Sequence, residues 1–425
     1  MFDETPLVLV DTKELLQEMA DRLGRSKVIG VDTESDSFHH YQEKVCLLQF
    51  SDLEGDIIVD PLAVDNDLTP LAKVFADPNV VKIFHGADYD IVCLKRDYAF
   101  EIRNLFDTMV ASQQLGVGRI GLADLIGEFF GVDIDKKFQR HDWASRPLYP
   151  EHIEYARGDT HWLLALREIL TRRLVKANRL ARVVEECRIL ESREWEGRRF
   201  DPDGWTRMKT RGVKLDDDGR RVLRHLWRYR DAQAKQLDRP AFKVIPDEVL
   251  VEVADARPES DADLEKLFPR SKSAMKRRHG PEFLKAVATG LDDDMPLPVP
   301  GAKRAKGPRP RLAGRAADLA FEALKAWRND LVAADPKLNP LAVASNGVLK
   351  NIAKMRPYDL IEMAAVPDIR VWQVEAHGET LLAVLEKAVP RSSVKDTPDE
   401  DEAEGEAAEG APRRRRRRRR SGGAE

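Results

Sequence analysis

The sequence predicts an α/β domain with a mixed sheet, followed by two smaller all-α modules. Three observations support this organisation. Over roughly the first 170 residues, short β-branched runs come first and then alternate with helical runs, which is typical of a sheet flanked by helices. From Pro150 onward, apolar residues recur at helical spacing. Two later segments, each about 75 residues long, resemble each other and indicate a duplicated helical module.

Length and composition exclude several classes of protein. The 425 residues allow about three domains. Apolar residues make up 42%, enough for packed cores, and charged residues make up 34%, above the usual quarter. The 70 Lys and Arg residues nearly balance 74 Asp and Glu residues, so net charge alone indicates no partner. No stretch approaches the roughly 20 consecutive apolar residues of a membrane-spanning helix, so no membrane association is expected.

The cysteines and the first five residues help to predict the cellular compartment of the protein. Cys46, Cys93 and Cys187 are odd in number, far apart and outside any CxxC pair, which argues against a disulfide framework and a cysteine-ligated zinc site. Residues 1–5 lack a basic region followed by an apolar one, so no signal peptide is expected. We therefore expect a soluble protein of the reducing cytoplasm, and we favour a monomer.

The first domain is expected to contain buried strands and a series of helices. Short β-branched and apolar runs predict strands at 28–31, 45–50, 57–59 and 80–84. Helical spacing predicts helices at 68–75, 89–96, 108–115 and 122–129. A longer helical run covers 151–174, where Pro150 suits the N-terminus, and another helix is expected at 180–195.

The two repeated segments share a Trp-Arg pair near their start and a His-Gly pair near their end, Trp227-Arg228 with His279-Gly280 and Trp327-Arg328 with His377-Gly378. The expected organisation is a first domain at 1–175, a helical connector at 176–214, modules at 215–292 and 313–390, a Pro- and Gly-rich linker at 293–312, and a tail at 391–425. The tail places an acidic stretch before eight arginines, Arg413–Arg420, and is expected to be disordered.

Two acidic residues lie at the end of the first predicted strand. Asp32 and Glu34 flank Thr33, and residues i and i+2 point to the same face of a strand. Two carboxylates side by side repel each other unless a cation lies between them. A solvated strand end is the alternative explanation for this pair alone.

Two further acidic positions lie far from this pair in the sequence. Asp90 follows the strand that ends at Phe84, in a turn into a helix where Asp88 is better placed to cap the helix. Tyr155 and Asp159 are i and i+4 residues on one helix face. A helix cap and an exposed helix face are the alternative interpretations of these residues taken alone.

The four carboxylates together predict a divalent-metal site formed by Asp32, Glu34, Asp90 and Asp159. Four converging carboxylates without basic partners would repel one another strongly in the absence of cations. Hard carboxylate oxygens suit Mg²⁺ or Mn²⁺ rather than zinc. Two such ions about 3.5–4 Å apart can hold a phosphate, one activating water and the other stabilising the leaving oxygen. We therefore expect two Mg²⁺ or Mn²⁺ ions per site and no other cofactor.

These positions resemble the three exonuclease motifs of the DEDD superfamily, in its tyrosine-bearing branch, and most closely the ribonuclease D family. The motifs correspond to Val31–Glu34, His85–Asp90 and Tyr155–Asp159. Residues 135–148 resemble the family's segment before the third motif, and the repeated modules resemble HRDC domains, the helicase-and-ribonuclease-D C-terminal module. The resemblance covers residues 8–390 and implies an RNase H-like exonuclease domain followed by two HRDC-like modules.

The resemblance also implies a role for each motif residue. Asp32, Glu34, Asp90 and Asp159 would hold the metal ions, and Tyr155 would orient the attacking water. In-line attack on the last phosphodiester would release a nucleoside 5′-monophosphate. With a pKa of about 10, Tyr155 is a poor base, so positioning is its expected contribution.

Several neighbouring positions leave alternatives open. His85 could touch the substrate or be a structural residue. Ser35 stands where the family often has a side chain that wedges the terminal base, and Phe38 or Tyr41 could replace that wedge or belong to the core. Trp143 is large enough to pack beneath the helix of the third motif.

The implied activity is 3′→5′ exoribonuclease action on tRNA precursors and other small structured RNAs with a single-stranded 3′ end. Basic clusters at 220–230 and 272–278 could bind RNA or form exposed charged faces. The arginines of the tail could bind phosphates electrostatically or serve solubility or protein binding. Two rival functions are DNA trimming by the same fold and a nonenzymatic RNA-binding scaffold.

Overall fold

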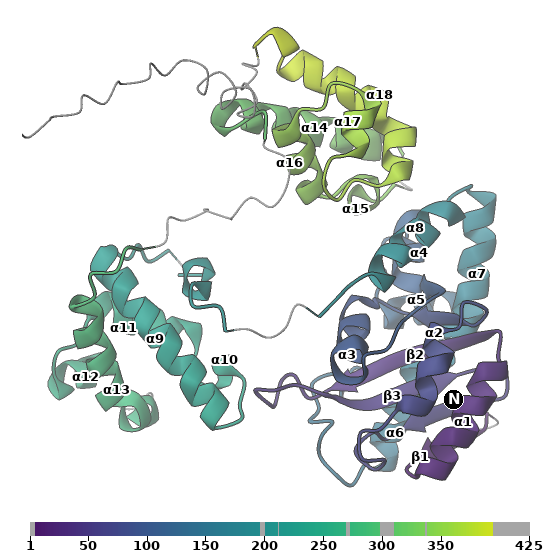
Figure 1. Ribbon diagram of the computed structural model, residues 1–425, viewed down its shortest axis with the longest axis horizontal. Coiled ribbons are helices and arrows are strands. Elements are labelled where there is room, and N and C mark those ends of the chain that lie inside the picture. Colours follow the sequence, from purple (N-terminus) through teal and green to yellow (C-terminus); the bar gives the residue numbers. More distant parts are fainter. Residues whose placement is uncertain are drawn as a thin grey trace, which may run out of the picture. The chain divides into compact units, whose positions relative to one another are not determined.

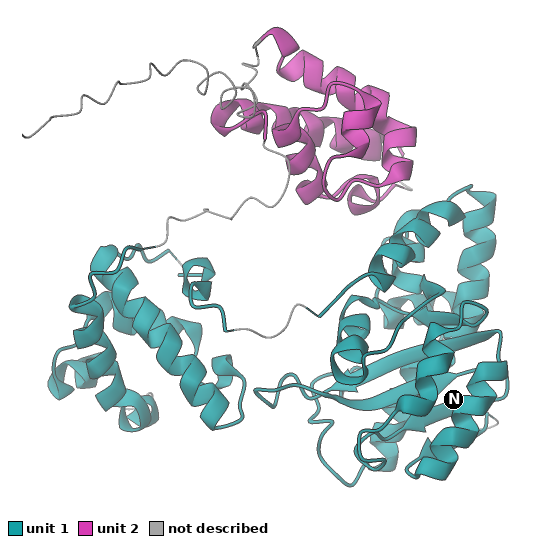
Figure 2. Cartoon of the chain, viewed as in Figure 1, with its two compact units in different colours: residues 1–304 teal, residues 305–425 magenta. Residues whose placement is uncertain are grey.

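The structure is a computed structural model that describes residues 5–195, 200–210, 212–268, 273–297, 310–335 and 338–393. The chain divides into two compact units, residues 1–304 and 305–425 (Figure 2). Unit 1 contains the sheet domain and the first helical module, and unit 2 contains the second module. Residues 394–425 of the predicted tail, most of the predicted linker and Lys272 lie outside the described residues. The first three residues of the predicted tail form a 3₁₀ turn, so the expectation of disorder was wrong for them.

The first domain is built on a six-stranded mixed sheet, which confirms the predicted fold class. Its strands are β1 (Leu7–Val10), β2 (Val28–Ser35), β3 (Val45–Ser51), β4 (Asp56–Val59), β5 (Val81–Phe84) and β6 (Leu105–Asp107). Their order in the sheet is β1-β4-β3-β2-β5-β6, and β2 pairs antiparallel with β3 but parallel with β5. The four predicted strands are confirmed. The two edge strands, β1 and β6, were not predicted because they are only four and three residues long.

Helices surround this sheet (Figure 1). They are α1 (Lys13–Arg25), α2 (Ala72–Ala76), α3 (Asp88–Tyr98), α4 (Thr108–Leu115), α5 (Leu122–Phe130), α6 (Pro150–His161), α7 (Leu163–Lys176) and α8 (Leu180–Glu191), with a 3₁₀ turn at Thr69–Leu71 before α2. The prediction of one helical run over 151–174 was wrong in one respect, because the run breaks at Trp162 into α6 and α7. Helix α6 packs on β2, β3 and β4, whereas α7 packs on β2, β5 and α4, so the two segments follow different parts of the sheet.

Both faces of the sheet are buried. Leu48 and Phe50 of β3 belong to the main core, while Cys46 and Leu47 belong to a smaller cluster that includes Ala156 of α6. The missing side chain of Gly30 in β2 permits the close approach of the α6–α7 junction. A Cβ atom at this position would lie 3.0 Å from the carbonyl oxygen of Thr160 and 3.3 Å from the Cβ of Leu163.

The two helical modules have the same succession of elements. The first consists of α9 (Asp217–Gln236), α10 (Ala241–Val244), α11 (Asp247–Ala256), α12 (Asp261–Leu267) and α13 (Ser273–Leu291), preceded by a 3₁₀ turn at Gly204–Arg207. The second consists of α14 (Gly314–Ala334), α15 (Pro340–Val343), α16 (Asn346–Met355), α17 (Leu360–Ala364) and α18 (Val371–Ala388), followed by a 3₁₀ turn at Arg391–Ser393. Each module has a hydrophobic core of its own.

A buried arginine occupies the same place in both modules and supports the predicted duplication. It equates Arg328 with Arg230, so the predicted match of Arg328 to Arg228 was wrong by two residues. Arg230 of α9 donates to the carbonyl oxygen of Ile245 at 3.1 Å and to Asp247 at 2.5 Å. Arg328 of α14 donates to the carbonyl oxygen of Ala344 at 2.8 Å and to Asn346 at 2.9 Å. In each module the arginine thus fixes the loop that leads into the third helix. Among the described helices, none combines the length and apolar character needed to cross a membrane.

Candidate active site

Strand β2 and helix α6 bring three of the predicted acidic residues together. Asp32 and Glu34 project from one face of β2, and Asp159 comes from the last turn of α6, which packs on that strand. One carboxylate oxygen from each lies within 4.8 Å of the others. The pairing of β2 with β3 becomes irregular between Glu34 and Ser35, directly after the second acidic residue. A register shift of this kind changes the direction of the side chains beside it.

Asp90 approaches the same site from the first turn of α3. Its side chain is 8% exposed, and Thr33 Oγ1 donates a hydrogen bond to it at 2.5 Å. Asp90 is not one of the three residues within 4.8 Å, but its charge raises the pKa of Asp32 and of Glu34. Asp88 lies elsewhere, in an exposed ion pair with Arg193 at 2.9 Å. Of the two aspartates, Asp90 is therefore the one placed beside the cluster.

The expected helix cap at Asp88 was wrong, because α3 begins with Ala87 as its N-cap and without a side-chain cap. The turn before α3 is instead held by Asp107, a buried residue at the end of β6. Asp107 accepts hydrogen bonds from the backbone N–H groups of Gly86 at 3.1 Å and Ala87 at 2.8 Å. It also accepts from the backbone N–H of Met109, which makes it the N-cap of α4. A carboxylate at the end of a three-residue strand gave no sequence signal of this role.

Burial and mutual repulsion raise the pKa values of all four carboxylates. Burial is the largest cause in each case, and neighbouring carboxylates add to it. The pKa of Asp159 rises to about 7 and that of Asp90 to about 6, while those of Asp32 and Glu34 rise well above their ordinary values. Among the described residues, no Lys or Arg side chain forms an ion pair with any of the four. The donor set is hard, anionic and short of positive charge, which fits a divalent cation such as Mg²⁺ or Mn²⁺.

Tyr155 lies on the same face of α6 as Asp159, one turn earlier. Its ring packs against Trp143, with centroids 5.9 Å apart, and edge-on against Phe138 at 5.8 Å. Burial, followed by the charges of Asp159 and Glu34, raises the pKa of Tyr155 above its ordinary value. The phenol therefore stays protonated at neutral pH and can donate a hydrogen bond beside the acidic cluster. The prediction that Trp143 packs beneath this helix is confirmed, since it is 1% exposed and shares a cluster with Ala156.

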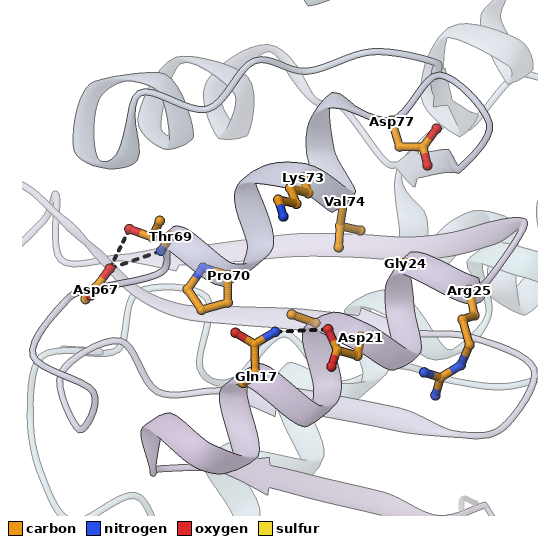
Figure 3. A pocket seen from close by; sticks show the side chains of 11 residues that line it. Gln17, Asp21, Gly24, Arg25, Asp67, Thr69, Pro70, Lys73, Val74 and Asp77 are labelled. Carbon is orange, nitrogen blue, oxygen red and sulfur yellow. Dashed lines mark hydrogen bonds between the residues drawn. The ribbon is translucent and has the colours of Figure 1, made fainter.

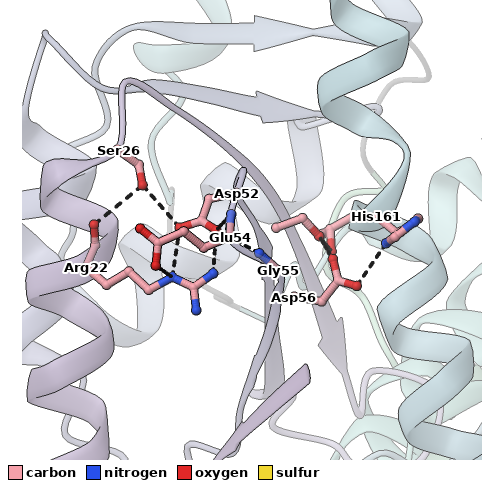
Figure 4. Close-up of polar contacts among 9 residues, drawn as sticks. Arg22, Ser26, Asp52, Glu54, Gly55, Asp56 and His161 are labelled. Atoms are coloured by element: carbon pink, nitrogen blue, oxygen red, sulfur yellow. Dashed lines mark hydrogen bonds and ion pairs between the residues drawn. The ribbon is translucent and has the colours of Figure 1, made fainter. Parts of the chain in front are cut away.

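A buried polar network fixes α6 on the sheet. Asp56, at the start of β4, accepts hydrogen bonds from Arg157 Nε at 2.6 Å and from Ser51 Oγ at 2.6 Å. Its other contact is with His161 Nδ1 at 2.9 Å (Figure 4). Arg157 and His161 lie on either side of Asp159 in the chain, so the network sets the position of the helix turn that carries this carboxylate. Sequence reasoning missed Asp56, because its partner Arg157 is 101 residues away.

The other three residues considered for substrate contact, His85, Tyr41 and Phe38, have different environments. His85 Nδ1 lies 2.9 Å from the hydroxyl of Thr108, and burial lowers the pKa of this histidine, which favours the structural interpretation. Tyr41 packs on the core of the first module and donates to Asp231 at 3.0 Å, so it does not stand in for a wedge at Ser35. Phe38 is 44% exposed, with the Arg140 guanidinium 5.8 Å from its ring centroid.

The basic cluster predicted at 220–230 is largely engaged inside the module. Arg224 and Arg230 are buried, the first against Asp293 and the second against Asp247. Arg220 and Arg221 pair with the carboxylates three residues before them on α9. The helical pattern could not show the pairings of Arg224 and Arg230, because Asp293 and Asp247 come from other parts of the module. Arg277 and Arg278 of α13 are exposed.

Comparisons with known proteins agree with a sheet domain followed by two helical modules. A family model described as 3′-5′ exonuclease matches residues 7–175, and the HRDC domain model matches 219–287 and 319–385. Ribonuclease D of Gluconacetobacter diazotrophicus is 30% identical over 387 residues, which is 89% of this chain and 92% of that protein. The exosome complex component 10 homolog of Caenorhabditis elegans is 35% identical over 60% of this chain, and the exosome complex exonuclease RRP6 of Saccharomyces cerevisiae is 34% identical over 59%. This chain spans 29% and 36% of those two proteins, about a third of their length.

Solved structures are similar over most of the chain. The catalytic core of RRP6 from Trypanosoma brucei is 32% identical with a TM-score of 0.62, over 69% of this chain and 82% of that one. RNase D of Escherichia coli is 24% identical with a TM-score of 0.66, over 90% and 99% of the two chains, and supports the fold. Because the match to the bacterial ribonuclease extends over nearly all of both sequences, this chain belongs to the ribonuclease D family.

Proposed function

We propose that this protein is a divalent-metal-dependent 3′→5′ exoribonuclease. The observation that carries the proposal is the meeting of Asp32, Glu34 and Asp159 within 4.8 Å, with Asp90 beside them and no basic partner among the described residues. An unused fold would have no reason to bury carboxylates whose repulsion raises their pKa values. Membership of the ribonuclease D family agrees with RNA as the substrate.

In this proposal the four carboxylates hold two Mg²⁺ or Mn²⁺ ions. The ions supply activation of water and neutralisation of the charge that develops on the phosphate. Tyr155 donates a hydrogen bond that orients the attacking water in line with the last phosphodiester bond. The new bond forms between the water oxygen and phosphorus, the bond to the 3′ oxygen breaks, and that oxygen takes up a proton. The products are a nucleoside 5′-monophosphate and a chain with a new 3′-hydroxyl.

The proposed substrates are tRNA precursors and other small structured RNAs with single-stranded 3′ extensions. The two HRDC domains favour nucleic acid, and the exposed pair Arg277 and Arg278 offers charge for a phosphate backbone. We further propose a monomer that acts in the cytoplasm. Trimming of DNA and a nonenzymatic RNA-binding scaffold are the two outcomes that would replace this proposal.

One experiment separates these functions. The purified chain is incubated with a 3′-extended tRNA and with a DNA of matched sequence, in Mg²⁺, in Mn²⁺ and in EDTA, and the products are resolved at single nucleotides. We expect stepwise removal of nucleotides from the RNA 3′ end with either metal and none in EDTA. Faster trimming of the DNA would favour the first rival, and no trimming of either would favour the scaffold.

The Asp32→Asn variant tests the site itself. Loss of one ligand charge should abolish hydrolysis, whereas relief of carboxylate repulsion should raise the stability of the metal-free protein. Mn²⁺ should raise the melting temperature of the parent chain, because metal binds the native state, and should raise that of Asp32→Asn much less. Activity of the variant within threefold of the parent would remove the metal assignment.

A further inference from the structure

A second pocket lies on the first domain, away from the acidic cluster. It has a volume of about 880 Å³ and is bordered by α7, α8 and the first residues of β5 and β6. We call it the α7–α8 pocket. Asp90 follows the end of β5, whereas Val81 at the pocket begins that strand, so the two sites lie at opposite ends of the sheet. The volume falls within the range of about 300–1,000 Å³ that small-molecule sites occupy.

Carboxylates in the pocket already have partners. Glu194 pairs with Lys95 at 2.9 Å, and Glu101 accepts from Arg103 Nε at 2.7 Å. Glu191 accepts from the backbone N–H of Leu105 at 2.7 Å. These contacts use both Lys95 and Arg103. Glu191 accepts from a neutral N–H and keeps its charge, so four cationic and three acidic side chains leave the wall with a formal charge of +1.

Among the described side chains, two further arginines in the pocket have no ion-pair partner. Arg167 of α7 and Arg188 of α8 both border it, and within the described part of the chain neither forms an ion pair. Burial lowers the pKa of Arg167 below its ordinary value, and no carboxylate offsets this effect. Placing a half-buried guanidinium without an ion-pair partner costs free energy, which an anion would recover.

The inner wall also carries donors that lack acceptors. Arg167 Nε and Thr171 Oγ1 are buried, and neither has a hydrogen-bond partner among the described residues. The two residues are i and i+4 on α7 and therefore share one face of the helix. Arg167 is held in place by the ring of Phe106, whose centroid lies 5.4 Å from the guanidinium carbon. A fixed guanidinium and a hydroxyl on one side of a cavity are suited to phosphate oxygens.

A hollow between α1 and α2 shows what a pocket without this feature looks like (Figure 3). It has a comparable volume of about 760 Å³. Gln17 donates to Asp21 at 2.9 Å, and the Thr69 hydroxyl donates to Asp67 at 2.6 Å, so these polar side chains satisfy one another. Arg25 and Lys73 also border this hollow without an ion pair among the described residues. None of its side chains, however, has a buried polar atom that lacks a partner in the described part of the chain, whereas the α7–α8 pocket has two, Arg167 Nε and Thr171 Oγ1.

We propose that the α7–α8 pocket binds a phosphate group, with Arg167 and Thr171 as inner donors and Arg188 as a second cation at the rim. Leu180 and Val184 of α8 add apolar wall, against which a ribose or base attached to the phosphate can lie. The phosphate belongs either to a mononucleotide or to the backbone of a nucleic acid bound elsewhere on the protein. The site is independent of the proposed hydrolysis, because none of its residues is in the acidic cluster.

The test uses the full chain in EDTA at fixed ionic strength, so that the acidic cluster holds no metal and repels anions. Inorganic phosphate, AMP and a 12-nucleotide RNA without terminal phosphates are titrated by calorimetry, and the melting temperature is followed in parallel. The variants are Arg188→Ala and Thr171→Val. Arg172→Gln is the matched control, because Arg172 is an exposed residue of α7 that pairs with Glu168 outside the pocket.

We expect phosphate-bearing probes to bind, and each pocket variant to weaken that binding about tenfold or more, while Arg172→Gln stays within about twofold. Thr171→Val should in addition raise the melting temperature without ligand, since it removes an unpaired buried hydroxyl. Variant-sensitive binding of phosphate and AMP alone identifies a mononucleotide site, and variant-sensitive binding of the RNA identifies a backbone site. The proposal is overturned if no probe binds or if Arg188→Ala and Thr171→Val bind as the parent does. Arg188 is an exposed residue, so its variant tests the proposal without a loss of the fold.

Discussion

Thr33 donates a 2.5 Å hydrogen bond to Asp90, although 57 residues separate the two in the sequence. The contact joins β2, which carries Asp32 and Glu34, to the first turn of α3. It therefore fixes the position of the fourth carboxylate relative to the other three. The same contact distinguishes Asp90 from its neighbour Asp88, which is turned toward Arg193.

The first prediction compares these two aspartates. Asp90→Asn should lower the rate of RNA hydrolysis by more than about 10²-fold, because it removes a charge from the acidic cluster. Asp88→Asn is the matched control and should retain activity within about twofold, since it breaks only an exposed ion pair. Single-turnover rates with a 3′-extended RNA measure both. The opposite order of effects would transfer the ligand role to Asp88.

The second prediction concerns Tyr155. Tyr155→Phe keeps the packing against Trp143 but removes the hydroxyl that we propose orients the water. The single-turnover rate should fall by about 10–10³-fold, equivalent to about 1.4–4 kcal/mol of barrier, with little change in RNA affinity. If affinity falls and the rate of chemistry does not, Tyr155 supports the substrate and not the water.

The third prediction concerns the network beneath α6. Asp56→Asn removes the buried charge that faces Arg157 and should lower the free energy of unfolding by about 3 kcal/mol. Glu154→Gln is its control, because Glu154 is half exposed and lies 3.5 Å from Arg157, and it should cost less than about 0.5 kcal/mol. Urea denaturation gives both values. Equal small effects would mean that Arg157 finds its stabilisation elsewhere.

The fourth prediction is a pH dependence of stability. Lys82 is fully buried and donates to the carbonyl oxygen of Asp77 at 2.7 Å, and burial lowers its pKa to about 8. In the unfolded chain its pKa is about 10.4, so between these values the unfolded state binds more protons and stability rises with pH.

Lys82→Met should therefore be more stable than the parent at pH 7, by about 1–2 kcal/mol, and should lose this advantage by pH 10. Denaturation at pH 7, 8.5 and 10 measures the difference. Lys73→Met, at an exposed position of α2, provides the control and should show no such trend. A constant difference between Lys82→Met and the parent at all three pH values would contradict the assigned titration.

The fifth prediction concerns the arginine-rich tail, which lies outside the described residues. Truncation should follow Ser393, because Arg391 still stacks on the ring of Tyr358 at 4.1 Å. Each engaged arginine contributes about 0.7 to the slope of log affinity against log salt for single-stranded nucleic acid. The truncated chain should bind RNA more weakly at low salt, with a flatter salt dependence, and turn over bound substrate at the parent rate. Parallel salt slopes for the two chains would show that the tail does not touch RNA.

Local patterns were sufficient for the parts of the fold in which apolar spacing decides the structure. Strand β3 is buried along its whole length, and its run of apolar residues predicted it directly. The break at Trp162 could not be predicted, because it depends on where α6 and α7 meet the sheet. Strand β6 has only three residues, too few for a pattern of apolar residues to predict it.

For the candidate site, sequence order identified the acidic residues but not the contacts that hold them. Asp32 and Glu34 were recognisable from alternation in a strand, and Tyr155 and Asp159 from helical spacing. The pairing of Asp56 with Arg157 joins residues from different elements, and the same is true of Asp107 and the turn at Gly86. Such contacts depend on the assembled sheet, and a single sequence carries no local trace of them.

Arg230 and Arg328, one in each module, identify the same structural position in this type of module. Each reaches a carbonyl oxygen 15 or 16 residues further along the chain, and each is nearly inaccessible to solvent. Loss of either side chain would leave a buried carbonyl group without a hydrogen bond. Substitution of the arginine is therefore costly, whereas surface residues around it can be replaced freely. In a distant sequence whose apolar pattern has faded, an arginine late in one helix and a short helix-breaking loop at this interval would locate the module. The arginine contact, present in both modules, thus allows the surface residues of the two modules to differ while their internal geometry stays the same.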